Sequence, residues 1–237
     1  MPKALLYSYA AFFAAYLIGS LSFAVIVSKL MGLSDPRTYG SQNPGATNVL
    51  RSGNKAAAVL TLVLDGLKGY VPVALVKWKS FDLGFDDITV AFVGVAAFVG
   101  HLWPVFFRFV GGKGVATALG VLQAYDVWLG LGVLLTWVFV AAVFRYSSLA
   151  AIVAAIMAPF YQLMFFSSPS VALGVTTMSL LLIWRHWRNI VKLASGKESR
   201  IGETAVPRRR HRHHHHSHQH TDSPGLAQPR QEHKKGP

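Results

Sequence analysis

Long apolar runs separated by short polar loops dominate the first 185 residues of the chain. Most of the runs approach the roughly 20 apolar residues that a helix needs to cross a bilayer. They cover residues 4–30, 56–76, 88–108, 127–144, 147–166 and 169–185. A further run of about 11 residues, 114–124, is either a short span or a re-entrant half-helix. Counting it, the pattern predicts an all-α, multi-pass integral membrane protein with seven transmembrane helices, one of them short.

Composition agrees with a membrane setting. Of the 237 residues, 52% are hydrophobic and only 14% are charged, which is more apolar surface than a water-soluble domain could cover. The chain has no Cys, so disulfides, thiolate metal sites and a Cys nucleophile are excluded. Nothing in the sequence calls for a metal or another cofactor, and we expect none.

The distribution of Lys and Arg predicts the orientation in the membrane. Basic residues of short loops remain on the cytoplasmic side of a bilayer. With seven spans and the N-terminus outside, twelve Lys and Arg fall inside and only Lys3, Lys77 and Lys79 fall outside. We therefore expect a cytoplasmic C-terminus. The unusual loops, 34–55, 107–114 and 144–148, then share the cytoplasmic face.

The last part of the chain differs in composition. Residues from 207 onward carry a formal charge of +5, are rich in His, Gln and Pro, and show no apolar periodicity. We expect a membrane domain over 1–203 and a basic, His-rich, disordered cytoplasmic tail over 204–237. Aromatic residues do not accompany the tail's charge, so binding to nucleic acid has little support.

The loop between the first two spans is dense in small and hydrogen-bonding residues. Its sequence from Tyr39 is YGSQNPGATNVLR, in which two glycines and a proline fix a turn. A polar connector would explain this loop as well as a site would. Gly45 before a helix start near Thr47 favours an anion site, because free amides at a helix start attract negative charge. The candidate donors are Ser41, Asn43, Thr47, Asn48 and Arg51.

Gly111-Gly112-Lys113-Gly114 is a sharper signal. Its glycines allow backbone N–H groups to converge, and a Lys among them adds a compact positive charge, as phosphate cradles require. The glycine spacing differs from a Walker A loop, and Val115 stands where the metal-binding Ser or Thr would be. Taken alone, such a stretch is more often a flexible turn. Its place at the start of a membrane helix beside Arg108 favours the phosphate cradle.

Two groups of polar residues lie inside or at the end of apolar runs. Asp65 and Lys68 are three residues apart, on one helix face, where a structural ion pair is favoured over direct catalysis. His101 ends a span, and a lone His in that position is usually structural.

His186 and Asn189 are also three apart and make a plausible hydroxyl-orienting site, although interfacial snorkelling explains the flanking arginines equally well. Ser148 could bind a phosphate or cap the N-terminus of the next helix, and the sequence favours neither role over the other.

Five motifs together resemble one family. They are GSQNPGATNVLR at 40–51, Asp-x-x-Lys-Gly at 65–69, GHLWPVFFRFVGGKGVAT at 100–117, RYSSLA at 145–150 and His-x-x-Asn at 186–189. In this order they resemble the bacterial acyl-phosphate:glycerol-3-phosphate acyltransferases, integral membrane enzymes of the PlsY type.

The resemblance implies an enzyme of phospholipid synthesis in the bacterial cytoplasmic (inner) membrane, with its active site on the cytoplasmic side. It would move a fatty acyl group from acyl-phosphate to the 1-hydroxyl of glycerol 3-phosphate, giving lysophosphatidic acid and phosphate. Its partners would be these two substrates, the lipid bilayer and a soluble enzyme that makes acyl-phosphate.

The resemblance also implies roles for particular residues. The amides from Gly111 to Gly114, including Gly112, would receive the phosphate of the acyl donor. Asn43, Gly45, Asn48, Asp65, Lys68, His101 and Arg108 would support the site. Lys113, His186 and Asn189 would also take part in catalysis. The glycerol 3-phosphate ligands would be Ser41, Arg51, Lys113, Ser148, His186 and Asn189.

Gln42 and Val110 depart from the family pattern. Val110 stands where a Lys is common in the family, and Arg108 is expected to offset the missing positive charge.

Direct acyl transfer is the expected mechanism. No His of the membrane part has an Asp four residues away, as the soluble-type acyltransferases do, and neither Ser41 nor Ser148 has the glycine elbow of an acyl-serine enzyme. A small-anion transporter is the alternative from another class. It predicts an inverted repeat and polar residues on both membrane faces, and the sequence shows neither.

Overall fold

The computed structural model describes residues 3–202, and this part of the chain folds into helices joined by loops, with no strand among these residues. The expected tail, 204–237, lies outside the described residues. In chain order the helices are α1 Lys3–Gly19, α2 Phe23–Leu30, α3 Ala46–Leu50, α4 Lys55–Trp78, α5 Ser80–Leu83, α6 Asp87–Leu102, the 3₁₀ turn η1 Val105–Phe107, α7 Val115–Tyr125, α8 Val127–Phe144, α9 Ser147–Phe165, α10 Pro169–Arg185 and α11 Trp187–Ala194.

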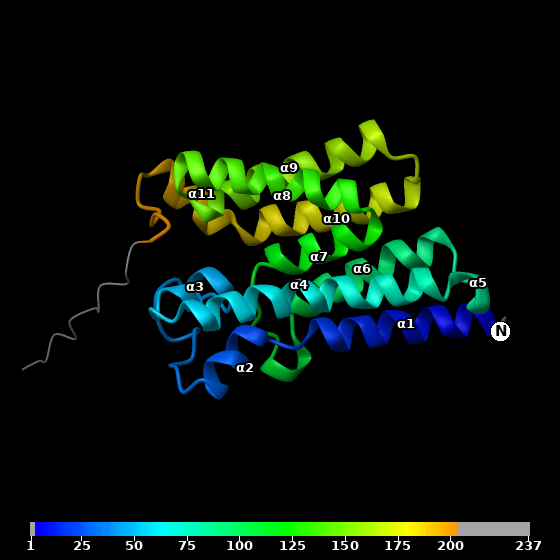
Figure 1. Ribbon diagram of the computed structural model, residues 1–237, viewed down its shortest axis with the longest axis horizontal. Helices are drawn as coiled ribbons and strands as arrows, with labels where there is room; N and C mark the ends of the chain where they lie inside the picture. The colour runs from blue at the N-terminus through cyan, green and yellow to red at the C-terminus, as the bar shows by residue number, and fades with distance from the viewer. Residues whose placement is uncertain (1–2, 203–237) are drawn as a thin grey trace, which may run out of the picture. The chain divides into compact units, whose positions relative to one another are not determined.

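The short helix α7 lies at the centre of the bundle. In Figure 1, α1, α4 and α6 pack on one side of it, while α8, α9 and α10 pack on the other. The largest cluster of buried apolar side chains fills the space between these helices. Large apolar side chains also point outward, among them Leu135, Val138 and Phe139 of α8. An apolar exterior of this kind suits lipid as the solvent.

Glycines bring α4 and α7 into backbone contact. A Cβ placed on Gly120 would lie 1.9 Å from the Gly66 carbonyl oxygen, and one on Gly69 would lie 2.2 Å from the Thr117 carbonyl oxygen. Small residues are the usual means of close helix packing in membranes, where burial of apolar surface does not draw helices together. This contact fixes where α7 begins, and therefore where the glycine loop before it lies.

The prediction of an all-α membrane protein is confirmed, whereas the predicted number of seven spans is not. Four segments are long and apolar enough to cross a bilayer: α4, α6 together with η1 (Asp87–Phe107), α8 and α9. The bent pair of α1 and α2 makes a fifth if it is one span. The two remaining apolar helices, α7 and α10, have 11 and 17 residues. At 1.5 Å per residue, α7 is about 16 Å long, about half the thickness of the hydrocarbon core.

The predicted first span, 4–30, is not one continuous helix. It breaks after Gly19, and α2 starts at Phe23 with a bend of 43°. Gly19 packs directly on α6, since a Cβ there would lie 2.0 Å from the Ala97 carbonyl oxygen. The break frees the Leu21 carbonyl, which accepts a hydrogen bond from Lys68 Nζ at 2.6 Å. Freed backbone groups at membrane depth need such a partner, so Lys68 stabilises the broken helix.

Candidate active site

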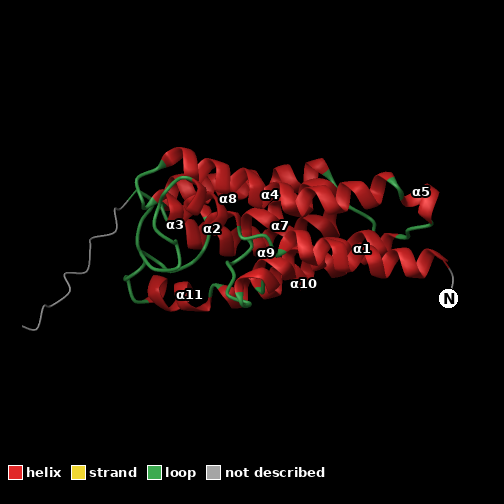
Figure 2. Cartoon of the chain, turned by 90° about the horizontal axis from the view of Figure 1, so that it is seen from below, coloured by secondary structure: helices red, strands yellow, loops and turns green. Residues whose placement is uncertain are grey.

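The longest loops of the described chain gather at one end of the bundle. Figure 2 shows them beside α2, α3 and α11, whereas α5 and the N-terminus lie at the opposite end. The loop before α3, the glycine loop before α7, the start of α9 and the segment after α11 all meet here. The structure therefore brings motifs from distant parts of the sequence to one end.

Asn48 organises the first loop from the inside. Its side chain is buried, accepts the Ser41 N–H at Oδ1 (3.0 Å) and donates from Nδ2 to the Pro36 carbonyl oxygen at 2.6 Å. Gly40 adopts a φ of +56°, and a Cβ there would lie 2.3 Å from Asn48 Oδ1, so only glycine fits. The predicted supporting role of Asn48 therefore has a geometric basis.

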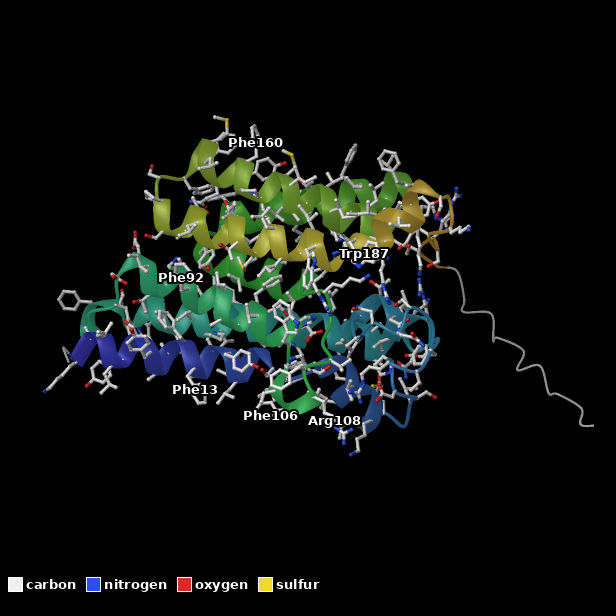
Figure 3. All side chains as sticks on the ribbon, turned by 180° about the vertical axis from the view of Figure 1, so that it is seen from behind. Phe13, Phe92, Phe106, Arg108, Phe160 and Trp187 are labelled. Atoms are coloured by element: carbon white, nitrogen blue, oxygen red, sulfur yellow. The ribbon has the colours of Figure 1, made fainter. Side chains whose placement is uncertain are left out.

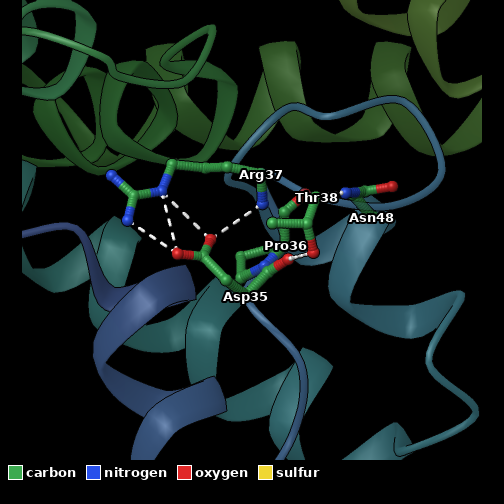
Figure 4. Close-up of polar contacts among 5 residues, drawn as sticks. All are labelled: Asp35, Pro36, Arg37, Thr38 and Asn48. Atoms are coloured by element: carbon green, nitrogen blue, oxygen red, sulfur yellow. Dashed lines mark hydrogen bonds and ion pairs between the residues drawn. The ribbon is translucent and has the colours of Figure 1, made fainter.

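An ion pair closes the outer part of the same loop. Arg37 grips both carboxylate oxygens of Asp35, with Nη2 at 2.6 Å from Oδ2, and Figure 4 shows this pair beside Thr38 and Asn48. The guanidinium of Arg37 also lies 6.0 Å from the centre of the Phe107 ring. The pair thus links the loop to the η1 turn before the glycine loop.

The glycine loop is held from both sides. Gly112 N–H donates to the His101 carbonyl oxygen at 3.2 Å, while Arg185 donates to the carbonyl oxygens of Gly111 and Gly112, each at 3.0 Å from Nη2. In a trans peptide the N–H points away from the C=O. Because the Gly112 carbonyl faces Arg185, the Lys113 N–H points away from Arg185.

These bonds revise the expectation for the loop amides. The Gly112 amide is already donated to His101, so Gly112 anchors the loop rather than binding a ligand through its N–H. Within residues 3–202, the amides of Gly111, Lys113 and Gly114 have no acceptor. Gly114 has a φ of +84°, and a Cβ there would lie 2.3 Å from the Phe98 ring. Three amides therefore stay available for an anion.

A chain of polar side chains forms the centre of the site. Lys113 Nζ donates to Asn189 Oδ1 at 2.5 Å, and Asn189 Nδ2 donates to Glu198 Oε1 at 2.6 Å. Ser148 Oγ donates to the same carboxylate oxygen at 2.7 Å. The alternative role of Ser148 as a helix cap is wrong, because α9 begins at Ser147 and no side chain caps it. We call Lys113, Ser148, Asn189 and Glu198 the polar cluster.

The segment after α11 ties the cluster to its surroundings. Arg51 donates a hydrogen bond to the Ser199 hydroxyl, next to Glu198. The Ile201 N–H donates to the Arg145 carbonyl oxygen at 2.7 Å, at the turn between α8 and α9. The segment from Lys197 to Ile201 therefore joins the predicted residues Arg51 and Ser148. The sequence motifs that contain these two residues did not predict these contacts.

Burial changes the protonation of two residues in the site. Burial lowers the pKa of Lys113 to about 8, and the Glu198 carboxylate acts in the opposite direction. Burial and then the charge of Lys113 lower the pKa of His186 to about 4. His186 is therefore neutral at physiological pH. Its Nδ1 lies 2.8 Å from the Leu182 carbonyl oxygen and must carry the proton, which leaves Nε2 as an acceptor.

Some predicted residues stand apart from the polar cluster. Ser41 is exposed, and within the described residues its one hydrogen bond is donated by its backbone N–H. Arg108 is exposed, and Figure 3 shows its side chain at the margin of the bundle, near Phe106. No hydrogen bond or ion pair joins Arg108 to the cluster in the described part of the chain. The expectation that Arg108 offsets the charge lost at Val110 therefore gains no support.

Sequence reasoning missed two residues at the centre of the site. Arg185 is one of the arginines that flank His186 and Asn189, for which interfacial snorkelling was an equal explanation, yet it holds the glycine carbonyls. Glu198 was not singled out, although it is the only acid between residues 185 and 200. A single carboxylate in so basic a segment was the signal that could have found it.

Comparison with known proteins gives one consistent result. The family model described as glycerol-3-phosphate acyltransferase matches residues 9–196. The chain is 63% identical over 188 residues to a glycerol-3-phosphate acyltransferase of Herminiimonas arsenicoxydans, covering 79% of this chain and 92% of the relative. It is 60% identical over 194 residues to the same enzyme of Ralstonia nicotianae, covering 82% and 94%.

Solved structures agree. The chain superposes with a TM-score of 0.77 and 39% identity on a crystal structure of PlsY, an integral membrane glycerol 3-phosphate acyltransferase, in its glycerol 3-phosphate form. The match covers 82% of this chain and 96% of that one. A second structure, the lysophosphatidic acid form, gives a TM-score of 0.75 at 38% identity, covering 81% and 94%.

Proposed function

The chain belongs to the glycerol-3-phosphate acyltransferase family, and from this premise we propose that its acyl donor is an acyl-phosphate and its acceptor atom the 1-hydroxyl of glycerol 3-phosphate. As a member of this family the protein is an acyltransferase of phospholipid synthesis. The alternative of a small-anion transporter is not supported, because relatives about 60% identical are acyltransferases.

One observation carries the proposal for the phosphate site. Ser148 and Asn189 both donate to one carboxylate oxygen of Glu198, at 2.7 and 2.6 Å, and the ammonium of Lys113 donates to Asn189 Oδ1 at 2.5 Å. Groups that hold a carboxylate are suited to a phosphate, which offers more acceptor oxygens and more charge. We assign this place to the glycerol 3-phosphate headgroup, with Arg51 as a further ligand.

The acyl donor would lie on the neighbouring glycine loop. The amides of Gly111, Lys113 and Gly114 lack acceptors within residues 3–202 and are available to its phosphate. Lys113 belongs to both the loop and the polar cluster, so one ammonium would lie between two anionic headgroups. Bringing two anions together is the main electrostatic cost of this reaction, and a shared cation reduces it.

The proposed chemistry is direct transfer. The hydroxyl oxygen attacks the acyl carbonyl carbon, the bond from that carbon to the phosphate oxygen breaks, and inorganic phosphate leaves. Before the attack, His186 Nε2 accepts a hydrogen bond from the hydroxyl and orients it, with Asn189 beside it. Because the pKa of His186 is lowered to about 4, this ring is a weak base and does not take the proton. As the new carbon–oxygen bond forms, the hydroxyl proton passes to an oxygen of a substrate phosphate.

The reaction is tested with the purified protein in lipid nanodiscs, given palmitoyl-phosphate and labelled glycerol 3-phosphate. We expect labelled lysophosphatidic acid from the parent, at least about a hundredfold less from Lys113→Ala, and parental activity from Lys55→Ala, whose lysine is exposed at the start of α4. Equal activity of the two lysine variants would remove Lys113 from the site.

The donor is tested separately by offering palmitoyl-CoA in place of palmitoyl-phosphate. Product from the thioester but not from the acyl-phosphate would refute the proposed donor while leaving the family assignment intact. An acyl-phosphate donor further implies a soluble enzyme that supplies it, which we propose as a partner.

For the membrane we propose seven spans in the bacterial inner membrane, with the N-terminus outside and the site on the cytoplasmic side. The support is the excess of Lys and Arg at the end of the bundle that holds the site. Because the chain lacks Cys, single substitutions Ser52→Cys and Asp82→Cys can be labelled in intact cells. An impermeant maleimide should reach only position 82; labelling of position 52 alone would reverse the orientation.

A further inference from the structure

A hydroxyl inside the bundle links three helices beneath the glycine loop. Thr117 lies in the first turn of α7 and is fully buried. Its Oγ1 is 2.9 Å from the Asp65 backbone oxygen on α4 and 3.1 Å from His101 Nδ1 on α6. No motif assigned Thr117 a role, and glycine packing between α4 and α7 fixes its position.

The two contacts determine which nitrogen of His101 carries a proton. A threonine hydroxyl has one proton, and the Asp65 carbonyl oxygen can only accept it. The bond to His101 must therefore run the other way, with Nδ1–H donating to Thr117 Oγ1. The Asp65 carboxylate is 3.8 Å from Nδ1, beyond hydrogen-bond distance, so it does not replace Thr117 as the acceptor. Within residues 3–202 no acceptor bonds to His101 Nε2, so a proton there would be buried without a partner. The ring is therefore neutral, and Nε2 keeps its lone pair.

The ring held in this way supports the glycine loop directly. A Cβ on Gly112 would lie 2.3 Å from His101 Nε2, so this ring edge packs on the Gly112 α-carbon. The carbonyl of the same His101 accepts the Gly112 N–H at 3.2 Å. On the other side of the loop, Arg185 holds the carbonyls of Gly111 and Gly112. A lone pair on Nε2 would repel a phosphate, so His101 is suited to hold the loop rather than to bind the anion.

We propose that Thr117 is a positioning residue for acyl transfer, which fixes the His101 ring and so holds the glycine loop open for a substrate phosphate. The inference rests on the proposed function, in which that phosphate belongs to the acyl donor. The buried pair of Asp65 and Lys68, at 2.8 Å, completes the support, because it holds the stretch of α4 whose carbonyl Thr117 contacts.

Kinetics of three variants test this proposal. Thr117→Val keeps the shape and removes the hydroxyl; Thr117→Ser keeps the hydroxyl. Thr61→Val is the matched control, since Thr61 is also fully buried but its hydroxyl has no hydrogen-bond partner among residues 3–202. We expect Thr117→Val to raise the KM for palmitoyl-phosphate roughly five- to tenfold, the worth of about one hydrogen bond. The KM for glycerol 3-phosphate and kcat should change less than about twofold.

Two further results are expected from the same assays. Thr117→Ser should restore the parental KM, and Thr61→Val should behave as the parent. Parental constants in a folded Thr117→Val, or a Ser variant as impaired as the Val variant, would overturn the proposal. A rise in the KM for glycerol 3-phosphate instead would support positioning and refute the assignment of the loop to the acyl donor.

A spectroscopic measurement decides the point without a change at Thr117. Nitrogen-15 labelling of histidine in the full-length protein, with His101→Asn used to assign the signal, should show His101 protonated at Nδ1 and unprotonated at Nε2. The opposite tautomer would overturn the proposal. This outcome does not depend on the acyl donor, so it stands even if palmitoyl-phosphate proves not to be a substrate.

Discussion

Titration of Lys113 gives the most direct test of the polar cluster. A lysine binds phosphate as the ammonium, so activity requires its protonated form. With a pKa lowered to about 8, about nine-tenths of the Lys113 side chains carry the proton at pH 7 and about one-tenth at pH 9. We therefore expect kcat/KM to be nearly constant below pH 7 with respect to this group and to fall about tenfold between pH 7 and pH 9.

The direction of the shift also predicts a difference between kinetic constants. The pH dependence of kcat/KM reports the free enzyme, whereas that of kcat reports the complex. Bound phosphates add negative charge near Lys113 and favour its ammonium form. The fall in kcat should therefore begin at a higher pH than the fall in kcat/KM.

Two variants identify the titrating group. Lys113→Arg replaces the ammonium by a guanidinium that stays charged throughout this range, so its residual activity should show no fall near pH 8. Glu198→Gln keeps an acceptor for Ser148 and Asn189 but removes the charge that raises the pKa of Lys113, so its fall should begin at a lower pH.

The assay is initial-rate formation of lysophosphatidic acid in nanodiscs across a series of buffers at constant ionic strength. Retention of the fold is checked by the midpoint of thermal unfolding at each pH. A constant kcat/KM up to pH 9, or an unchanged fall in Lys113→Arg, would refute the assignment of the titration to Lys113.

Three further predictions follow from burial and packing. Gly112→Ala should lose most activity, because its Cβ would lie 2.3 Å from His101 Nε2, whereas Gly132→Ala, with 3.6 Å to its nearest neighbour, should behave as the parent in the same assay. Asp65→Asn should lower the free energy of unfolding in detergent by about 3–5 kcal/mol, because it leaves buried Lys68 without its counter-charge. A double change of Asp65 and Lys68 to Leu should lower it by less. A larger loss in the double variant than in Asp65→Asn would contradict a paired role. His186→Gln should reduce kcat by the same factor, roughly tenfold or more, at pH 6 and pH 7.5, because the pKa of His186 is lowered to about 4; a factor that changes with pH would show that His186 titrates in this range.

The polar cluster extends beyond the last motif, which ends at Asn189. Glu198 lies nine residues further along the chain, yet its carboxylate joins Asn189 to Ser148. The segment around it is also tied to Arg51 and to the turn before α9. The site is therefore completed by a piece of chain that carries no glycine-rich or paired motif.

The sequence by itself determined the class of the protein and singled out candidate residues for its site. Apolar runs of membrane length depend only on local composition, so most of the helices were predictable within a few residues. Glycine loops and charged residues in apolar surroundings are costly unless they have a role, which is why Lys113, Asp65 and Lys68 could be singled out.

Only the tertiary structure decided which groups meet. The break at Ser20–Ser22 depends on Gly19 packing on α6 and on Lys68 reaching the Leu21 carbonyl, 47 positions away in sequence. The role of Arg185 depends on carbonyls 73 and 74 positions earlier, and the link from Ser148 to Glu198 spans 50. A polar side chain has the same residue type whatever it contacts, and its partner is set by how the helices pack.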